Sequence, residues 1–112
     1  MNISVLAPPP TAQVSFLRSQ LRFVPVRSGC YVLTTFAREV LYVGLASNLR
    51  QRCGQHLDSP EKRGLSPRGR AVLFHWLECD EINKVERTWL EAHVRHEGVL
   101  PPLNRANSPV SV

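Results

Sequence analysis

An arginine and a histidine spaced one helical turn apart are the side chains of this chain best suited to chemistry. Arg52 and His56 follow Ser47, a residue type that often begins a helix, and residues four apart share one helix face. A guanidinium group stays charged at any working pH, and its planar fork matches the oxygens of a phosphate. An imidazole can transfer a proton near neutral pH. The pair predicts a phosphate contact with proton transfer beside it.

Two tyrosines precede this pair in neighbouring apolar runs. Tyr31 lies near the start of one run and Tyr42 near the end of the next. A phenol with a pKa of about 10 is a poor base at neutral pH, so proton transfer requires a metal or a cation such as Arg52 nearby. A buried strand tyrosine with a hydrogen-bonded hydroxyl is the structural alternative for both. Gly44 would let a phosphate approach closely, although a glycine that only ends a strand also fits.

Two glutamates of the longest predicted helix are candidates for holding a metal ion. A carboxylate suits Mg²⁺, which takes only one or two protein groups and keeps several waters. At about 100° per residue, Glu86 borders the main apolar face of this helix and Glu91 lies nearly opposite. Leu90 and Val94 form a second apolar edge, and a helix buried on both sides would place Glu91 within the site. The main apolar face consists of Ile82, Val85, Trp89 and His93.

The elements that position these side chains follow from local patterns. Residues 29–35 and 39–45 are rich in β-branched and aromatic types, and the short stretch between them is a hairpin-length connection. A helix is predicted from 48 to about 57, with Ser47 as its N-cap and a buried stripe at four-residue steps. Prolines and glycines over 58–70 predict a solvent-facing loop whose basic side chains contact a nucleic-acid backbone.

The remaining segments complete a sheet with helices beside it. Residues 70–79 predict a third strand, and 80–97 the longest helix. A short capping helix is predicted over 14–21, and residues 100–104 return without regular structure. The order strand, strand, helix, strand, helix predicts an α+β fold with a small three-stranded antiparallel sheet flanked by helices.

Length and composition narrow the classes of protein further. A chain of 112 residues predicts one modest domain, which we place at 24–105 between an N-terminal extension at 1–23 and a flexible tail at 106–112. The formal net charge of +5 and a pI of about 9.7 favour a polyanionic partner, although ordinary solvated charge gives the same balance.

Cysteine usage and the N-terminus predict a cytoplasmic protein. Cys30, Cys53 and Cys79 are odd in number and lack a C-x-x-C spacing, so reduced thiols are expected. The segment MNISVLAPPP has neither the basic region nor the long apolar core of a signal peptide, and no apolar run is long enough to cross a bilayer. We therefore expect no membrane partner.

Six short matches, in the right order, resemble the GIY-YIG family of nucleases. The resemblance covers roughly residues 24–105, with Cys30 in place of the family's usual isoleucine. It implies a domain that cuts a phosphodiester bond with one divalent metal ion. The matched segments are Gly29-Cys30-Tyr31, Tyr42-Val43-Gly44, Arg52, His56, Trp89-Leu90-Glu91-Ala92 and Pro101-Pro102-Leu103-Asn104.

The resemblance also implies roles for individual residues. Tyr31 would accept the proton of the attacking water, and Tyr42 would orient water or phosphate. Arg52 and His56 would hold the phosphate, and Glu91 would bind Mg²⁺ or Mn²⁺, with Glu86 as the alternative ligand. Asn104 would tie the returning tail to the site, although a turn asparagine after two prolines fits nearly as well. The expected nucleic-acid contacts are Gly44, Arg50, Lys62, Arg63, Arg68 and Arg70.

Taken together, these expectations describe a metal-dependent DNA endonuclease. Branched or damaged DNA fits as its substrate, and the sequence leaves a partner protein or a homo-oligomer open. A binding module that keeps the fold without the catalysis is the main alternative, because no room remains for a separate DNA-binding domain. A zinc-stabilised domain built on Cys79, His93 and His96 is a third interpretation, which lacks a fourth ligand at a recognisable spacing.

Overall fold

The predicted hairpin forms one side of a single antiparallel sheet. The computed structural model describes residues 1–107, the last three by their backbone alone. Strands β2 (Gly29–Thr34) and β3 (Val40–Ala46) pair with each other, and β6 (Leu73–Glu78) pairs with the other side of β2. The strand order is β1-β6-β2-β3, which leaves β3 at one edge. The α+β class and the antiparallel sheet are confirmed.

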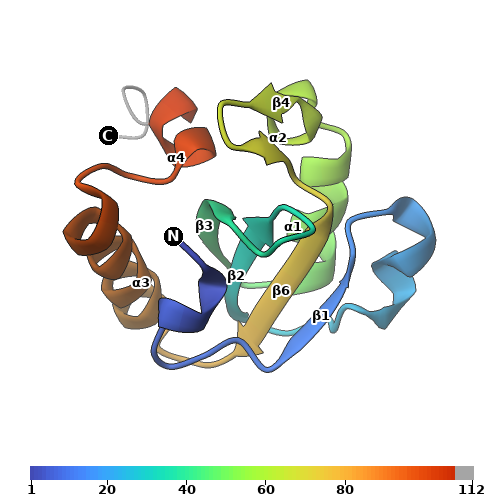
Figure 1. The fold of residues 1–112 in the computed structure, drawn as a ribbon. Helices are drawn as coiled ribbons and strands as arrows, with labels where there is room; N and C mark the ends of the chain where they lie inside the picture. Colours follow the sequence, from blue (N-terminus) through green and yellow to red (C-terminus); the bar gives the residue numbers. More distant parts are fainter. Residues whose placement is uncertain (108–112) are drawn as a thin grey trace.

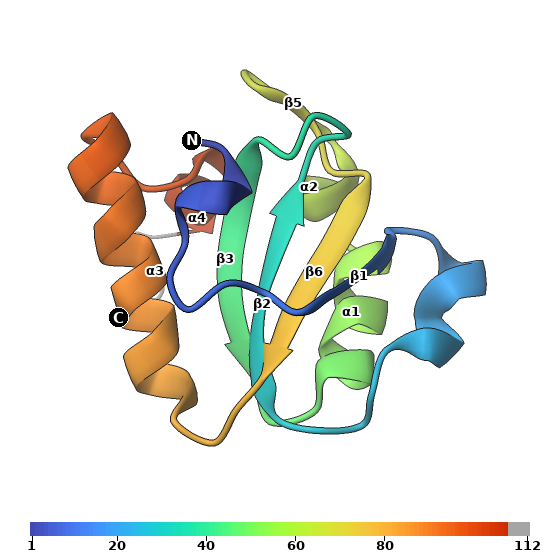
Figure 2. The same ribbon diagram turned by 60° about the horizontal axis from the view of Figure 1, so that its bottom comes forward.

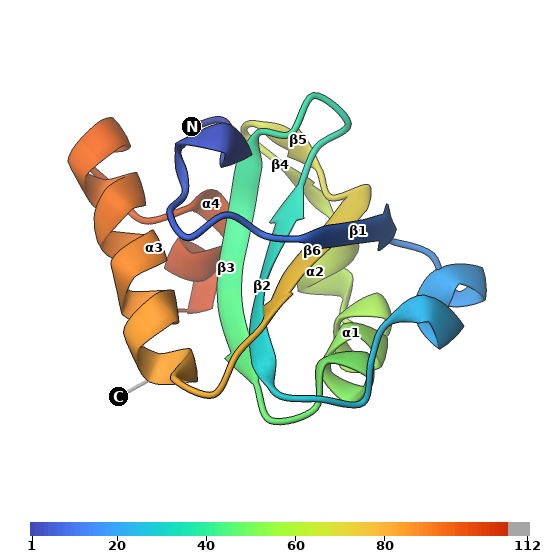
Figure 3. The same cartoon turned by 90° about the horizontal axis from the view of Figure 1, so that it is seen from below.

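The sheet has a fourth strand, which the sequence did not predict. Strand β1 (Ala12–Ser15) pairs with β6 at the edge opposite β3 (Figure 3). The predicted helix over 14–21 is therefore wrong at its start, because alternate residues of β1 are exposed, as in an edge strand with one covered face. A 3-10 helix, η2 (Arg18–Phe23), follows it, and another, η1 (Ile3–Val5), precedes it.

Helices cover both faces of the sheet (Figures 1 and 2). Helix α1 (Leu49–Leu57) packs on one face and α3 (Ile82–Glu97) on the other. Every residue of β2 is buried as a result. Asn48, one residue after the predicted Ser47, caps α1, since its Oδ1 accepts the backbone N–H of Gln51 at 3.0 Å. Gly98, with φ of 83°, ends α3 as a left-handed C-cap.

The predicted loop at 58–70 contains regular structure. Helix α2 (Pro60–Arg63) begins after Ser59, whose Oγ accepts the backbone N–H of Lys62 at 3.4 Å. A small hairpin follows, made of β4 (Leu65–Ser66) and β5 (Gly69–Arg70). The prediction failed here because a serine cap followed by proline starts a helix even in a segment rich in turn residues.

The tail after α3 also departs from the prediction. It forms helix α4 (Pro102–Asn107), which lies beside the β3 edge of the sheet (Figure 1). Pro102 is compatible with a first helical position, where no backbone N–H is required. The predicted flexible tail at 106–112 lies, beyond Asn107, outside the described residues.

The N-terminal residues pack against the sheet. The Met1 ammonium lies 2.5 Å from a carboxylate oxygen of Glu39 and 2.8 Å from one of Glu97. The Arg68 guanidinium pairs with the same two carboxylates. This network joins the N-terminus, the β2–β3 hairpin and the end of α3. Over residues 1–107, the helices lack the length and apolar character that crossing a bilayer requires.

Candidate functional site

Three aromatic rings from separate elements form the centre of the site. Tyr31 on β2, Tyr42 on β3 and His56 on α1 meet on the α1 side of the sheet. The Tyr31 hydroxyl oxygen lies 2.5 Å from Nε2 of His56. Ring centroids lie 6.0 Å apart for the two tyrosines and 5.3 Å apart for Tyr42 and His56. The structure thus brings together the first, second and fourth of the six predicted catalytic residues.

Burial sets the protonation of this cluster. Tyr31 is fully buried, His56 is 8% exposed and Tyr42 is partly exposed. Burial raises the pKa of Tyr31 well above its usual value, with the nearby Arg52 opposing the shift, and raises the pKa of Tyr42 in the same way. Burial, followed by the charges of Lys62 and Arg52, lowers the pKa of His56 to about 3. At neutral pH the cluster therefore holds two phenols and an uncharged imidazole.

Gly44 gives the Tyr31 ring its space. Gly44 is paired with Tyr31 across the hairpin. A β-carbon at position 44 would lie 2.5 Å from both Cζ and Oη of Tyr31 and 2.8 Å from Cε2 of Tyr42. Any side chain there would displace both tyrosines. The close approach expected at this glycine is made by a phenol of the protein itself.

Arg52 borders the cluster from α1. Its Nη1 donates to the carbonyl oxygen of Leu45 at 3.3 Å, and its side chain is partly exposed. The charge of Arg52 acts on the pKa values of Tyr31, Tyr42 and His56 alike. The helical spacing thus does what the sequence predicted, because it directs Arg52 and His56 to one place.

Lys62 reaches the same cluster, which the sequence did not reveal. Its Nζ lies 4.7 Å from the centroid of the Tyr42 ring, and the residue is 5% exposed. Burial lowers its pKa, with Glu61 opposing. Among residues 1–104, whose side chains are described, it has no ion pair. Sequence reasoning placed Lys62 on a solvent-facing loop, and only the α2 turn shows that it points inward.

The other predicted nucleic-acid contacts divide into two groups. Arg50 is held by the fold, since its Nε donates to the carbonyl oxygen of Val24 at 2.7 Å. Arg68 is neutralised by its two carboxylate partners. Arg63 and Arg70 are exposed. Of these four arginines, Arg63 and Arg70 present free positive charge on the surface.

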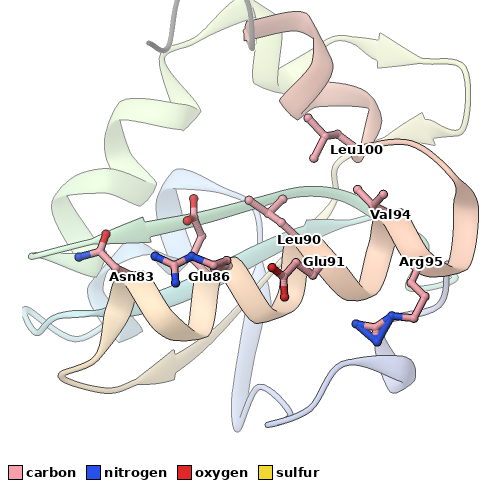
Figure 4. A pocket seen from close by; sticks show the side chains of 8 residues that line it. Asn83, Glu86, Leu90, Glu91, Val94, Arg95 and Leu100 are labelled. Atoms are coloured by element: carbon pink, nitrogen blue, oxygen red, sulfur yellow. The ribbon is translucent and has the colours of Figure 1, made fainter.

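The two candidate metal ligands line the same pocket along α3, but their carboxylates point in different directions (Figure 4). The carboxylate of Glu86 extends toward the side of α3 that bears Leu90, whereas that of Glu91 points away from it (Figure 4). Glu86 is partly buried, and its charge raises the pKa of Tyr42. Burial raises the pKa of Glu86 itself. Glu91 is exposed. Of these two carboxylates, only Glu86, the alternative ligand, acts on the pKa of Tyr42, and Glu91 does not join the cluster.

Asn104 is tied to the site through the backbone of β3. Its Oδ1 accepts the N–H of Val43 and its Nδ2 donates to the carbonyl of Val43, both at 2.9 Å. Val43 lies between Tyr42 and Gly44, so the amide fixes the edge strand where the site is built. The predicted tie exists, but it runs through Val43 and not through a glutamate.

A metal at this site would rest on few protein groups. Within residues 1–104, no set of three or more histidine, cysteine, aspartate or glutamate side chains is arranged to hold an ion. Nδ1 of His93, a candidate zinc ligand, lies 2.7 Å from the carbonyl oxygen of Val99. Glu86, partly buried and without an ion pair among those residues, fits Mg²⁺ with water and substrate oxygens completing its shell.

The family comparison agrees with this arrangement of residues. The model of the GIY-YIG catalytic domain matches residues 27–97. The chain belongs to the GIY-YIG family. The match spans both tyrosine strands, α1 and α3, and so contains the whole aromatic cluster with Arg52 and Glu86. Membership of the GIY-YIG family supports a nuclease at the level of the family.

Curated relatives carry the same region within much longer chains. UvrABC system protein C of Symbiobacterium thermophilum is 35% identical over 66 residues, which is 59% of this chain and 10% of that protein. The protein of the same name from Finegoldia magna is 39% identical over 46 residues, covering 41% of this chain and 8% of the relative. That of Alkaliphilus metalliredigens is 32% identical over 59 residues, covering 53% and 9%. The chain thus spans about a tenth of these GIY-YIG relatives.

Proposed function

We propose that this protein is a metal-dependent endonuclease that hydrolyses phosphodiester bonds in DNA. The observation that carries the proposal is the convergence of Tyr31, Tyr42 and His56 with Arg52 beside them and Glu86 across the β3 edge. Phosphodiester hydrolysis requires a proton acceptor for water, cations for the phosphate and a place for a metal. The cluster supplies a side chain for each.

The proton of the attacking water would leave through the tyrosines to His56. Tyr31 is fully buried, so water meets the partly exposed Tyr42 first. Tyr42 would accept the proton of the water and donate its own hydroxyl proton to Tyr31. Tyr31 would in turn donate its hydroxyl proton to Nε2 of His56, which lies 2.5 Å from the Tyr31 hydroxyl oxygen. This requires the His56 tautomer that carries its proton on Nδ1. A neutral imidazole can accept this proton without a phenolate being formed.

Substrate binding would strengthen His56 as a base. Burial is the main cause of its low pKa in the free protein, and the charges of Lys62 and Arg52 lower the pKa further. A bound phosphate would offset both charges and remove that part of the shift, so the pKa of His56 would rise. The acceptor thus becomes basic when the substrate is present, which ties proton transfer to phosphate binding.

Arg52 and Lys62 would hold the scissile phosphate. The guanidinium can donate to two phosphate oxygens, and the ammonium adds a second positive charge. As water oxygen bonds to phosphorus, the bond to the leaving oxygen breaks and that oxygen takes a proton from solvent. Both cations remain in place throughout, so they stabilise the charge that builds on the phosphate.

Glu86 would hold the metal, in place of Glu91. The effect of its charge on the pKa of Tyr42 and its lack of an ion pair within residues 1–104 support the assignment. A bound Mg²⁺ or Mn²⁺ would supply a positive charge that polarises a phosphate oxygen.

A cleavage assay tests the proposed activity. The purified protein would be incubated with plasmid, branched and single-stranded DNA in Mg²⁺, in Mn²⁺ or in EDTA. We expect metal-dependent cleavage of at least one substrate and its loss in Arg52→Ala. Exposed Arg27→Ala, which changes the same residue type outside the cluster, is the matched control. Cleavage that is absent for every substrate, or unchanged in Arg52→Ala, contradicts the proposal.

A DNA-binding module without turnover is the second candidate. Full burial of Tyr31 and a His56 pKa of about 3 in the free protein favour it, since both weaken a resting catalytic site. Steeply salt-dependent DNA binding without cleavage would support this candidate. All three cysteines are free, which accords with the cytoplasmic location that we propose for either function.

A further inference from the structure

An exposed phenylalanine stands between two hollows on the surface away from the catalytic cluster. Phe36, at the tip of the β2–β3 hairpin, is 80% exposed. It lines a hollow of about 560 Å³ together with Arg63, and a second of about 630 Å³ beside β5. Arg70 lines both hollows. An exposed aromatic side chain thus shares each hollow with at least one arginine.

The charge of the first hollow is of one sign. Its charged lining residues are Arg63 and Arg70, and the rest of its lining is apolar apart from one serine. Among the residues whose side chains are described, Arg63 donates to the backbone carbonyl of Leu57 and has no ion pair with an acid. A cavity with apolar walls and unpaired cations is complementary to a ligand that combines a flat apolar face with a negative charge. A nucleotide with an unstacked base has this chemistry.

Helix α2 connects this hollow to the catalytic cluster. Lys62 turns inward over the Tyr42 ring, and the next residue, Arg63, lines the hollow. A strand whose phosphate lies near Lys62 can therefore continue past Arg63 toward Phe36. The second hollow has less free positive charge, because Arg68, its other cation besides Arg70, is already paired with two glutamates.

We propose that Phe36, with Arg63 and Arg70, binds an unpaired nucleotide of a DNA strand. The base stacks on the Phe36 ring, and the two arginines contact the adjoining phosphates. Recognition of this kind selects DNA with single-stranded segments over a fully paired duplex. The inference rests on the proposed action on DNA, but it concerns binding and not the catalytic cluster.

Fluorescence anisotropy in EDTA tests the site without catalysis. The probes are a fluorescein-labelled single strand of about 12 nucleotides and a blunt duplex of the same sequence. We expect Phe36→Ala to weaken single-strand binding about tenfold and duplex binding far less. Phe36→Trp should retain the single-strand affinity. Arg70→Ala should weaken binding to both probes and reduce the salt dependence.

Phe23→Ala is the matched control. Phe23 is 54% exposed and also lies beside an arginine, with Arg22 4.9 Å from its ring centroid, but it lines neither hollow. Its substitution should leave both affinities unchanged. Circular dichroism would establish that each variant is folded.

The outcomes separate this inference from the proposed function. Unchanged single-strand binding in Phe36→Ala, an equal loss for both probes, or no binding of the single strand by the wild-type protein overturns the inference. Cleavage of plasmid in Mg²⁺ by the same preparations reports on the nuclease independently. Cleavage with no effect of Phe36→Ala removes the nucleotide site alone, whereas selective loss of binding without cleavage removes the nuclease alone.

Discussion

The hydroxyl of Tyr31 and Nε2 of His56 lie 2.5 Å apart in a region from which solvent is almost excluded. Tyr31 belongs to β2 and His56 to α1, so the pair exists only when the helix is packed on the sheet. Burial disfavours charge on both groups, which leaves a phenol beside a neutral imidazole. This pair is the proton acceptor in the proposed reaction.

Tyr31→Phe should slow cleavage without preventing binding. The substitution keeps the buried ring and removes the hydroxyl that connects Tyr42 to His56. Loss of a general base or its relay lowers rates by about 10²- to 10⁴-fold. Single-turnover cleavage with enzyme in excess measures the effect, and anisotropy should show DNA affinity close to that of the wild type. Full activity in this variant would exclude Tyr31 from proton transfer.

Gly44→Ala should disturb the site through sterics alone. The new methyl group would lie 2.5 Å from the Tyr31 ring and hydroxyl, so the tyrosines must move. Overpacking of this kind costs about 1–3 kcal/mol of stability. Urea denaturation measures the cost, and cleavage should be lost together with it.

Gly54→Ala is the control at a glycine with open space beside it, and the opposite result is expected. At position 54, within α1, a β-carbon would meet only Leu21 Cδ2 at 3.5 Å, an ordinary contact. Alanine is the better helix former, so stability should rise by about 0.5–1 kcal/mol. No destabilisation at 44 would mean that the tyrosines are less tightly packed than described, and destabilisation at 54 would mean that α1 has less free space beside it than described.

Stability should fall as the pH is lowered from neutral toward about 4. The pKa of His56 is about 3 and that of His75 about 4 in the folded protein, chiefly because of burial. The unfolded chain binds protons at both histidines near pH 6.5, whereas the folded protein does not, so stability is lost below that pH. Each histidine should contribute a loss on the order of 1 kcal/mol by about pH 5.5.

His56→Gln isolates one of these two contributions. The variant removes one titrating group, so its stability should depend less steeply on pH between 6.5 and 4 than that of the wild type. Urea denaturation at several pH values gives the two slopes. Equal slopes would show that His56 is protonated in the folded protein at those pH values.

Much of the fold follows from the sequence because its central elements carry strong local patterns. The β2–β3 hairpin and helices α1 and α3 have runs of strand-forming or periodic apolar residues. Strand β1 is short and pairs only with the distant β6, so its identity depends on a tertiary contact. Helix α4 likewise forms where the chain returns to the β3 edge. Local patterns do not contain such long-range contacts.

The site residues likewise divide into those placed by local spacing and those placed by tertiary contacts. The spacing of Arg52 and His56 is local, and both residues lie one turn apart on α1. The choice between Glu86 and Glu91 depends on which side of α3 meets the sheet, and the apolar periodicity, with Trp89 fully buried, indicates the side near which Glu86 is partly buried. The inward direction of the Lys62 side chain depends on a single helical turn within a segment of prolines and glycines. Such a short turn has no periodic pattern in the sequence.

Asn104→Ala should weaken the attachment of α4 to the sheet. It removes both hydrogen bonds to Val43 and leaves a strand N–H and carbonyl without those partners. The expected loss is about 1–3 kcal/mol. Asn104→Asp is the sharper comparison, because it keeps an acceptor for the Val43 N–H but places a charged oxygen against the Val43 carbonyl. Urea denaturation should rank wild type above both variants, and equal stability of all three would show that the tie is dispensable.

Nicking of supercoiled plasmid in Mg²⁺ by wild-type, Glu86→Gln and Glu91→Gln protein tests the central claim most directly. Both substitutions remove one negative charge from α3, but of the two carboxylates only Glu86 acts on the pKa of Tyr42. The wild-type protein should nick the plasmid, Glu91→Gln should match it, and Glu86→Gln should lose activity by about 100-fold or more. An inactive wild-type protein, or activity that survives in Glu86→Gln and is lost in Glu91→Gln, would contradict the account.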